Sequence, residues 1–146
     1  MEHNAVMRPL VQLEKEGVSF DRVPCDGRGR MDPEELRGLI RPNTRLVVMA
    51  HASNVCGTVQ DAEAVGKICS EYGIPFALDA AQTAGHIPVD FERFRLSALV
   101  VPGHKGLLGP QGIGALLLDK GFAARLRPLI AGGTGSASDS EELPDW

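Results

Sequence analysis

The sequence lacks any apolar run long enough to cross a membrane. The stretch LVVMA at residues 46–50 is typical of its apolar runs and falls far short of the ~20 residues that a membrane helix needs. The first residues, MEHNAVMR, also lack the cationic and apolar layout of a signal peptide. From the sequence we therefore expect a cytoplasmic protein with no membrane partner.

Cysteine is scarce, and its spacing carries no motif. The three cysteines, Cys25, Cys56 and Cys69, show no C-x-x-C pair, and an odd number in a reducing compartment argues against a disulfide framework and against a zinc site. We therefore expect no metal site. The simplest interpretation of all three thiols is that they are small, buried apolar side chains.

An excess of positive charge is also missing. The chain has 15 Lys and Arg against 19 Asp and Glu, a net charge of -4, with acids and bases interspersed. This pattern argues against a nucleic-acid partner. What is present, 146 residues of which 43% are hydrophobic and 23% charged, predicts one globular domain with a substantial core.

Helix and strand patterns alternate along this domain. Capping residues place helix starts at Asp32-Pro33 and at Asp61, and an earlier amphipathic stretch predicts a helix over 5–16. The expected strands are VSFDRVP (18–24), TRLVVMA (44–50), IPFALDA (74–80), LSALVVP (96–102) and IGALLL (113–118).

This order predicts an α/β three-layer sandwich around a mostly parallel sheet. The connection between the last two expected strands is too short for a crossover helix, so the final strand should run antiparallel to the one before it. We assign residues 1–131 to this domain and expect the Gly/Ser-rich, acidic tail 132–146 to be loose.

Polar side chains follow three of the expected strands, where ligands bind in open α/β sheets. They are Asn54 after the strand TRLVVMA, Asp79 and Gln82 after IPFAL, and His104 and Lys105 after LSALVVP. Each also has a structural interpretation: Asp79 could cap a turn, Asn54 could form an Asx turn, Gln82 could satisfy a backbone group, and Lys105 could be solvated.

Taken together, these groups suit one kind of cofactor. A carboxylate, two amides, an imidazole and an amine match a ring nitrogen, a phenolic oxygen, a phosphate and an aldehyde. That combination predicts pyridoxal phosphate, with Lys105 attached to the aldehyde and Asp79 paired with the ring nitrogen. The glycines around Lys105 would allow close backbone approach, although a tight bend between two strands would also need them.

The same stretches resemble a known family. The chain resembles the large-domain core of class V aminotransferase-fold enzymes of the cysteine desulfurase and selenocysteine lyase group. The resemblance rests on MEHNAV, VVMAHASNVCGTV, LDAAQTAGHIPVD and VVPGHKGLLGPQGIG. It implies that Lys105 is the cofactor lysine, that Asp79 is the pyridinium partner, and that Gln82 donates to the phenolic oxygen.

The resemblance also implies three further roles. Asn54 would lie close to the phenolic oxygen and the substrate carboxylate, and His104 would reach the cofactor phosphate. His3 matches the family histidine that stacks on the ring and moves protons, so it joins Lys105 as a catalytic candidate.

The chain departs from the family pattern in several places. Pro102 stands where related desulfurases commonly have a serine, and proline offers neither a hydroxyl nor an N–H to a phosphate. The family's Gly/Thr-rich phosphate turn and its C-terminal domain, with the nucleophilic cysteine and substrate-binding arginine, have no counterpart here. None of the three cysteines matches that nucleophile. We therefore expect part of an enzyme that is inactive or impaired alone.

Several interpretations of function stay open at this point. The leading one is part of a cysteine desulfurase-like enzyme acting on a cysteine-like amino acid; an aminotransferase or lyase of the same fold is an alternative. A second is a catalytically silent assembly or interaction fragment. Under either interpretation, open sheet edges around VSFDRV would favour a homo-oligomer or a rearranged edge. A third, a nucleotide-binding domain, is weaker because the glycine loop leads into a strand, whereas nucleotide-binding loops open a helix.

Overall fold

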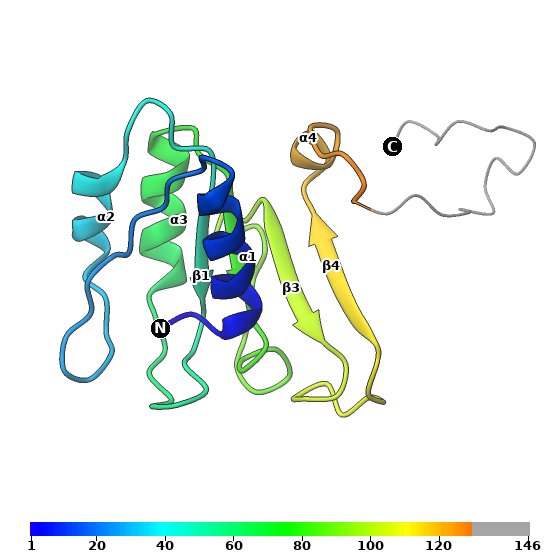
Figure 1. Ribbon diagram of the computed structural model, residues 1–146. Helices are drawn as coiled ribbons and strands as arrows, with labels where there is room; N and C mark the ends of the chain where they lie inside the picture. The colour runs from blue at the N-terminus through cyan, green and yellow to red at the C-terminus, as the bar shows by residue number, and fades with distance from the viewer. Residues whose placement is uncertain (130–146) are drawn as a thin grey trace, which may run out of the picture.

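The computed structural model describes residues 1–129 and contains one mixed sheet. Its four strands lie in the order β1-β2-β3-β4. The first three run parallel and β4 runs antiparallel to β3, which confirms the predicted α/β class and the antiparallel last strand (Figure 1). Their bounds are β1 Val47–Ala50, β2 Phe76–Asp79, β3 Ala98–Pro102 and β4 Gly114–Leu118.

Capping side chains set where two of the helices begin. Asp32 accepts a hydrogen bond from Glu34 N–H at 3.0 Å, and Asp61 accepts one from Ala64 N–H at 2.9 Å, as the sequence predicts. Figure 1 shows α3 and α1 on either side of β1. The helices are α1 Asn4–Lys15, α2 Pro33–Leu39, α3 Ala62–Glu71 and α4 Lys120–Ala123.

The hydrophobic core lies between α3 and one face of the sheet. Phe76 and Leu78 alternate along β2 and are fully buried, as are Val65 and Ile68 of α3. Full burial of each such side chain is worth about 1.5–3 kcal/mol. Because side chains alternate across a strand, Asp79 lies on the opposite face of β2 and is half-buried.

The expected strand over residues 18–24 is wrong. This segment has no strand in the structure, and only an isolated bridge between Cys25 and Met31 lies near it. A strand needs a hydrogen-bonded neighbour, and β1, the nearest candidate, is paired with β2 alone among the described strands. A groove of about 770 Å³, which we call the edge groove, separates residues 17–23 from β1 and is also lined by α1.

The prediction that all three cysteines are buried is also wrong. Cys69 is buried on the inner face of α3, but Cys25 and Cys56 are exposed. Both exposed thiols lie in irregular segments, where no helical or strand periodicity turns a side chain toward the core. Burial raises the pKa of the Cys69 thiol to about 12, which makes it unreactive.

Two further predictions concern the C-terminal tail and membrane-spanning helices. The loose tail predicted over 132–146 lies outside the described residues. Within residues 1–129, no helix is both long and apolar enough to span a bilayer.

A glycine in α3 provides a test of this packing. A Cβ atom at Gly66 would overlap the carbonyl oxygen of Phe94, whereas one at Gly38 in α2 would meet no atom within 4 Å. We expect Gly66→Ala to lower the free energy of unfolding in urea by about 2 kcal/mol or more. The matched control Gly38→Ala should leave it within about 1 kcal/mol of the parent, on the stabilising side. Equal effects of the two substitutions would contradict the packing of α3 on residues 91–95.

Candidate active site at the carboxyl ends of the parallel strands

Strand register brings the ends of β1, β2 and β3 side by side. Asp79, the last residue of β2, pairs with Ala50 of β1 and with Val100 of β3. Paired residues of neighbouring strands point to the same face of a sheet. These three positions therefore form a row on the face opposite the Phe76–Leu78 core, and Val100 is 43% exposed there.

Asp79 bonds the local backbone through only one of its two carboxylate oxygens. Its Oδ1 accepts a hydrogen bond from Ala81 N–H at 2.8 Å, so it does cap the turn that follows β2. This turn cap uses Oδ1 and does not involve the remaining oxygen, Oδ2. Gln82 lies in the same turn and is half-buried.

The turn after β2 touches the loop that carries Lys105. A Cβ atom at Gly85 would overlap the carbonyl oxygen of Gly106, and one at Gly106 would overlap that of Ala84. The two backbones therefore approach as closely as only glycine permits. This contact places the segment with Asp79 and Gln82 directly against the segment with Lys105.

The Lys105 loop is held by its own backbone hydrogen bonds. Gly109 N–H donates to the Gly103 carbonyl at 2.7 Å, and Leu108 N–H donates to that of Lys105 at 2.9 Å. Leu108 has a φ of 55°, a conformation that non-glycine residues rarely adopt and that marks local strain. Within this loop Lys105 is half-buried and His104 is exposed.

The loop after β1 is anchored by a buried polar pair. His51 is 3% exposed, and its Nδ1 lies 3.0 Å from the Thr83 hydroxyl in the turn after β2. This pair connects the loop that carries Asn54 to the turn that carries Gln82. Asn54 itself is exposed.

His3 lies at the start of α1 and serves as its N-cap. Its Nδ1 accepts a hydrogen bond from Ala5 N–H at 3.1 Å, so the proton of the neutral ring resides on Nε2. Glu2, directly before it, accepts a hydrogen bond from Ala50 N–H at 2.8 Å. This bond brings the start of α1 to the carboxyl end of β1.

Two residues next to these candidates were not assigned a role from the sequence. Glu2 and Thr83 each bond across to another element, Glu2 to β1 and Thr83 to His51. The only signal for them in the sequence is adjacency, since Glu2 precedes His3 and Thr83 follows Gln82. Which distant backbone or side chain each would reach depends on the fold.

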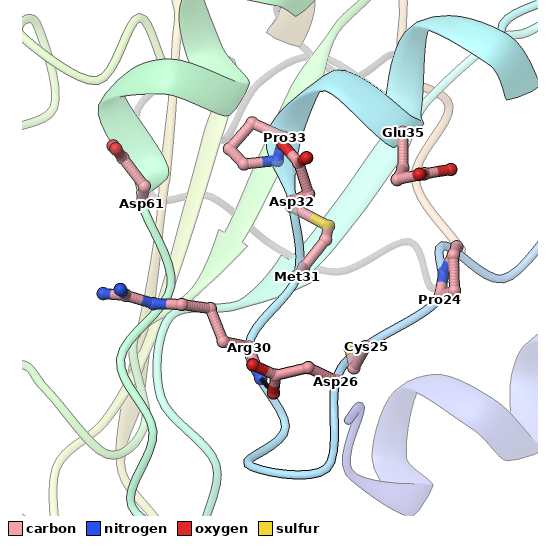
Figure 2. A pocket seen from close by; sticks show the side chains of 9 residues that line it. All are labelled: Pro24, Cys25, Asp26, Arg30, Met31, Asp32, Pro33, Glu35 and Asp61. Atoms are coloured by element: carbon pink, nitrogen blue, oxygen red, sulfur yellow. Dashed lines mark hydrogen bonds between the residues drawn. The ribbon is translucent and has the colours of Figure 1, made fainter.

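Acidic residues also gather around a cavity of about 520 Å³ at the start of α2 and α3, shown in Figure 2. Three of these four carboxylates serve the local backbone: Asp26 accepts from Arg28 and Arg30 N–H, and Asp32 and Asp61 are helix caps. Among residues 1–129, no cluster of three or more His, Cys, Asp or Glu could hold a metal ion. Neither this cavity nor the edge groove is lined by any of the predicted site residues.

The buried His51 makes stability depend on pH. Burial lowers the pKa of His51 below its ordinary value of 6.5, so the unfolded chain binds a proton more readily than the folded one. The contribution of neutral His51 is therefore complete above pH 6.5 and is lost as the pH falls below it. We expect the free energy of unfolding in urea to fall as the pH is lowered below about 6.5, by no more than about 1.4 kcal/mol per pH unit from this group.

His51→Gln should reduce this pH dependence, while His86→Gln, at an exposed position, should preserve it. An unchanged pH profile in the His51 variant would contradict the assignment.

The contact between the two loops can be tested at Gly106. We expect Gly106→Ala to move the Lys105 loop away from the turn after β2, because its methyl group would overlap the Ala84 carbonyl and approach His86 Nε2 to 2.9 Å. Amide chemical shifts of residues 84–86 should report the displacement. The control Gly27→Ala, where a Cβ atom would meet nothing within 4 Å, should leave those signals in place. Unshifted signals in Gly106→Ala would mean that the loops do not touch.

The chain is similar in sequence to curated cysteine desulfurases. The chain is 40% identical over 134 residues to the cysteine desulfurase IscS of Dictyoglomus turgidum, covering 92% of this chain and 33% of that protein. It is 37% identical to a probable cysteine desulfurase of Methanothermobacter thermautotrophicus, covering 97% and 35%. The chain thus spans about a third of the length of the curated relatives it matches.

Solved structures share the fold as well. The apo cysteine desulfurase from Thermococcus onnurineus superposes with a TM-score of 0.85 at 33% identity, covering 90% of this chain and 33% of that one. SspA in complex with cysteine gives a TM-score of 0.84 at 35% identity, covering 94% and 39%. The model of the family described as aminotransferase class-V matches residues 1–143, and the chain therefore belongs to this family.

Proposed function

We propose that this chain forms part of the pyridoxal phosphate site of a cysteine desulfurase-like enzyme. The observation that carries the proposal is the contact between Gly85 and Gly106, which sets the segment of Asp79 and Gln82 against the segment of Lys105. Membership of a family of pyridoxal phosphate enzymes supports it.

The donor set at the strand ends fits this cofactor. Oδ2 of Asp79 is left free by the turn cap and can hold the proton of a pyridinium nitrogen. The amine of Lys105 can attach to the aldehyde, while Gln82 and Asn54 offer amide donors and His104 an imidazole for the phosphate. The bound group would supply an electron sink for a carbanion next to the substrate amine.

Each candidate site residue would then have a separate role. Asp79 would accept a hydrogen bond from the protonated ring nitrogen, and Gln82 and Asn54 would orient the ring through its phenolic oxygen. His3, with its proton on Nε2, can stack on the ring and move a proton, and Lys105 can transfer one at the reacting carbon once its amine is free.

The reaction class and substrate follow from relatives rather than from this site. The relatives are cysteine desulfurases, and one structural neighbour is described in complex with cysteine. We assign a cysteine-like amino acid as substrate and propose that residues 1–131 form part of the cofactor-binding domain. Pro102 pairs with Gly114 at the end of β3 and offers no donor to a phosphate, so affinity for the cofactor should be modest.

One observation favours a second function, that of an assembly module without catalysis. β1 lies at an edge of the sheet, and the edge groove runs along it. An edge strand with unpaired backbone groups favours pairing with another chain, so a homo-oligomer would be the expected state of such a module.

Cofactor binding separates the two functions. We expect the purified chain mixed with pyridoxal phosphate to develop a new absorption band, and borohydride reduction to fix a covalent adduct that peptide mapping locates at Lys105. Lys105→Ala should abolish this adduct, and the control Lys67→Ala, at an exposed position on α3, should retain it. Labelling spread evenly over the lysines, or no labelling, would favour the silent assembly module.

A further inference from the structure

Glu2 makes an unusual contact for a residue at the start of a helix. Its Oε1 accepts a hydrogen bond from Ala50 N–H at 2.8 Å, on the edge of β1 that faces away from β2. Within residues 1–129 this is the hydrogen bond that joins the segment 1–17 to the sheet. It therefore fixes where α1 begins relative to the strand ends.

Apolar packing of α1 does not fix the position of this helix relative to the sheet. No residue of α1 is buried, and Val6, Leu10 and Leu13 face the edge groove rather than a closed core. A helix held by a half-open groove could slide or tilt, because the hydrophobic effect is not directional. A hydrogen bond to one chosen amide does specify a position.

The buried position of the Glu2 carboxyl is energetically unfavourable. Its Oε2 is buried and has no hydrogen-bond partner among the described residues. Burying an unpaired polar atom is unfavourable. Burial raises the pKa of Glu2. The bond from Ala50 and the charge of the N-terminal amine lower it, and the charge of Asp79 makes a smaller contribution that raises it. A solvated side chain at this position would avoid that cost.

The neighbours of Glu2 indicate what the bond achieves. His3 follows it directly and keeps its Nε2 free, because Nδ1 caps the helix. Ala50 pairs with Asp79 in the sheet. The bond to Ala50 therefore links the backbone of His3 to the row of strand positions that includes Asp79.

We propose that Glu2 is a positioning residue of the cofactor site, whose carboxylate ties the start of α1 to Ala50 and thereby sets where His3 stands relative to Asp79. This inference rests on the proposed function, since it gives His3 a task at a bound ring. Glu2 itself does not touch the cofactor; it acts through His3.

The main test is the affinity for pyridoxal phosphate, measured by absorbance titration. We expect Glu2→Ala to weaken binding about tenfold, the loss that follows when one charge-assisted hydrogen bond no longer orders the site. Glu2→Gln retains an acceptor oxygen and should stay within about threefold of the parent. Glu14→Ala, an exposed acid on the same helix, is the matched control and should bind as the parent does.

A double-mutant cycle distinguishes positioning from general stability. If Glu2 acts through His3, the variant Glu2→Ala/His3→Ala should bind no more weakly than His3→Ala alone. Additive losses, or unchanged affinity in Glu2→Ala, would overturn the proposal. Circular dichroism at the titration temperature shows whether each variant is folded, and Glu2→Gln keeps the test open if the alanine variant does not fold.

Amide exchange without cofactor tests the tie itself. We expect the Ala50 amide to exchange faster in Glu2→Ala, while the His51 amide, which donates to the Asp79 carbonyl at 2.9 Å within the sheet, stays protected. Unchanged Ala50 exchange would overturn the proposal. If the parent chain does not bind the cofactor, the proposed function fails, and Glu2 loses its assigned task even where the exchange result shows that the tie exists.

Discussion

The contact between the backbones at Gly85 and Gly106 is the constraint on which the candidate site depends. It occurs where the turn after β2 meets the loop after β3, and neither position has room for a Cβ atom. β2 and β3 are already paired in parallel, so their carboxyl ends are neighbours. The contact extends that proximity from the strands to the loops. It is what sets the turn of Asp79 and Gln82 against the loop of Lys105.

The two faces of β2 differ: one packs in the hydrophobic core, and the other carries the candidate site residue Asp79. Phe76 and Leu78 point toward α3 and are fully buried, while Asp79 lies on the other face and is half-buried. The first face supplies the stability that keeps the strand in place. The second can therefore carry a carboxylate without the full cost of desolvating it. The same division explains why α1, on the side without a closed core, depends on a polar bond from Glu2 to Ala50 for its position.

Two polar side chains among the site candidates bond the local backbone with one atom and leave a second polar atom outside that bond. Asp79 caps a turn with Oδ1, and His3 caps α1 with Nδ1. In each case the structural role occupies one atom of the side chain, and the role that we propose at the cofactor would use another atom. A local hydrogen bond of this kind fixes the rotamer, so the free atom points in a defined direction. Structural use is thus no argument against a role in binding.

The helices and strands whose signals are local could be predicted from the sequence alone. The caps at Asp32 and Asp61, the continuous apolar strands and the short link before the antiparallel β4 all depend on neighbouring residues, and they fixed the order of helices and strands. The sequence also identified the polar residues at the strand ends. It misassigned residues 18–24, where a strand pattern lacks a hydrogen-bonding partner, and the exposure of Cys25 and Cys56. Three contacts could not be predicted from the sequence: Gly85 with Gly106, His51 with Thr83 and Glu2 with Ala50. Each joins residues that are far apart in the chain, so it depends on how the strands and loops pack.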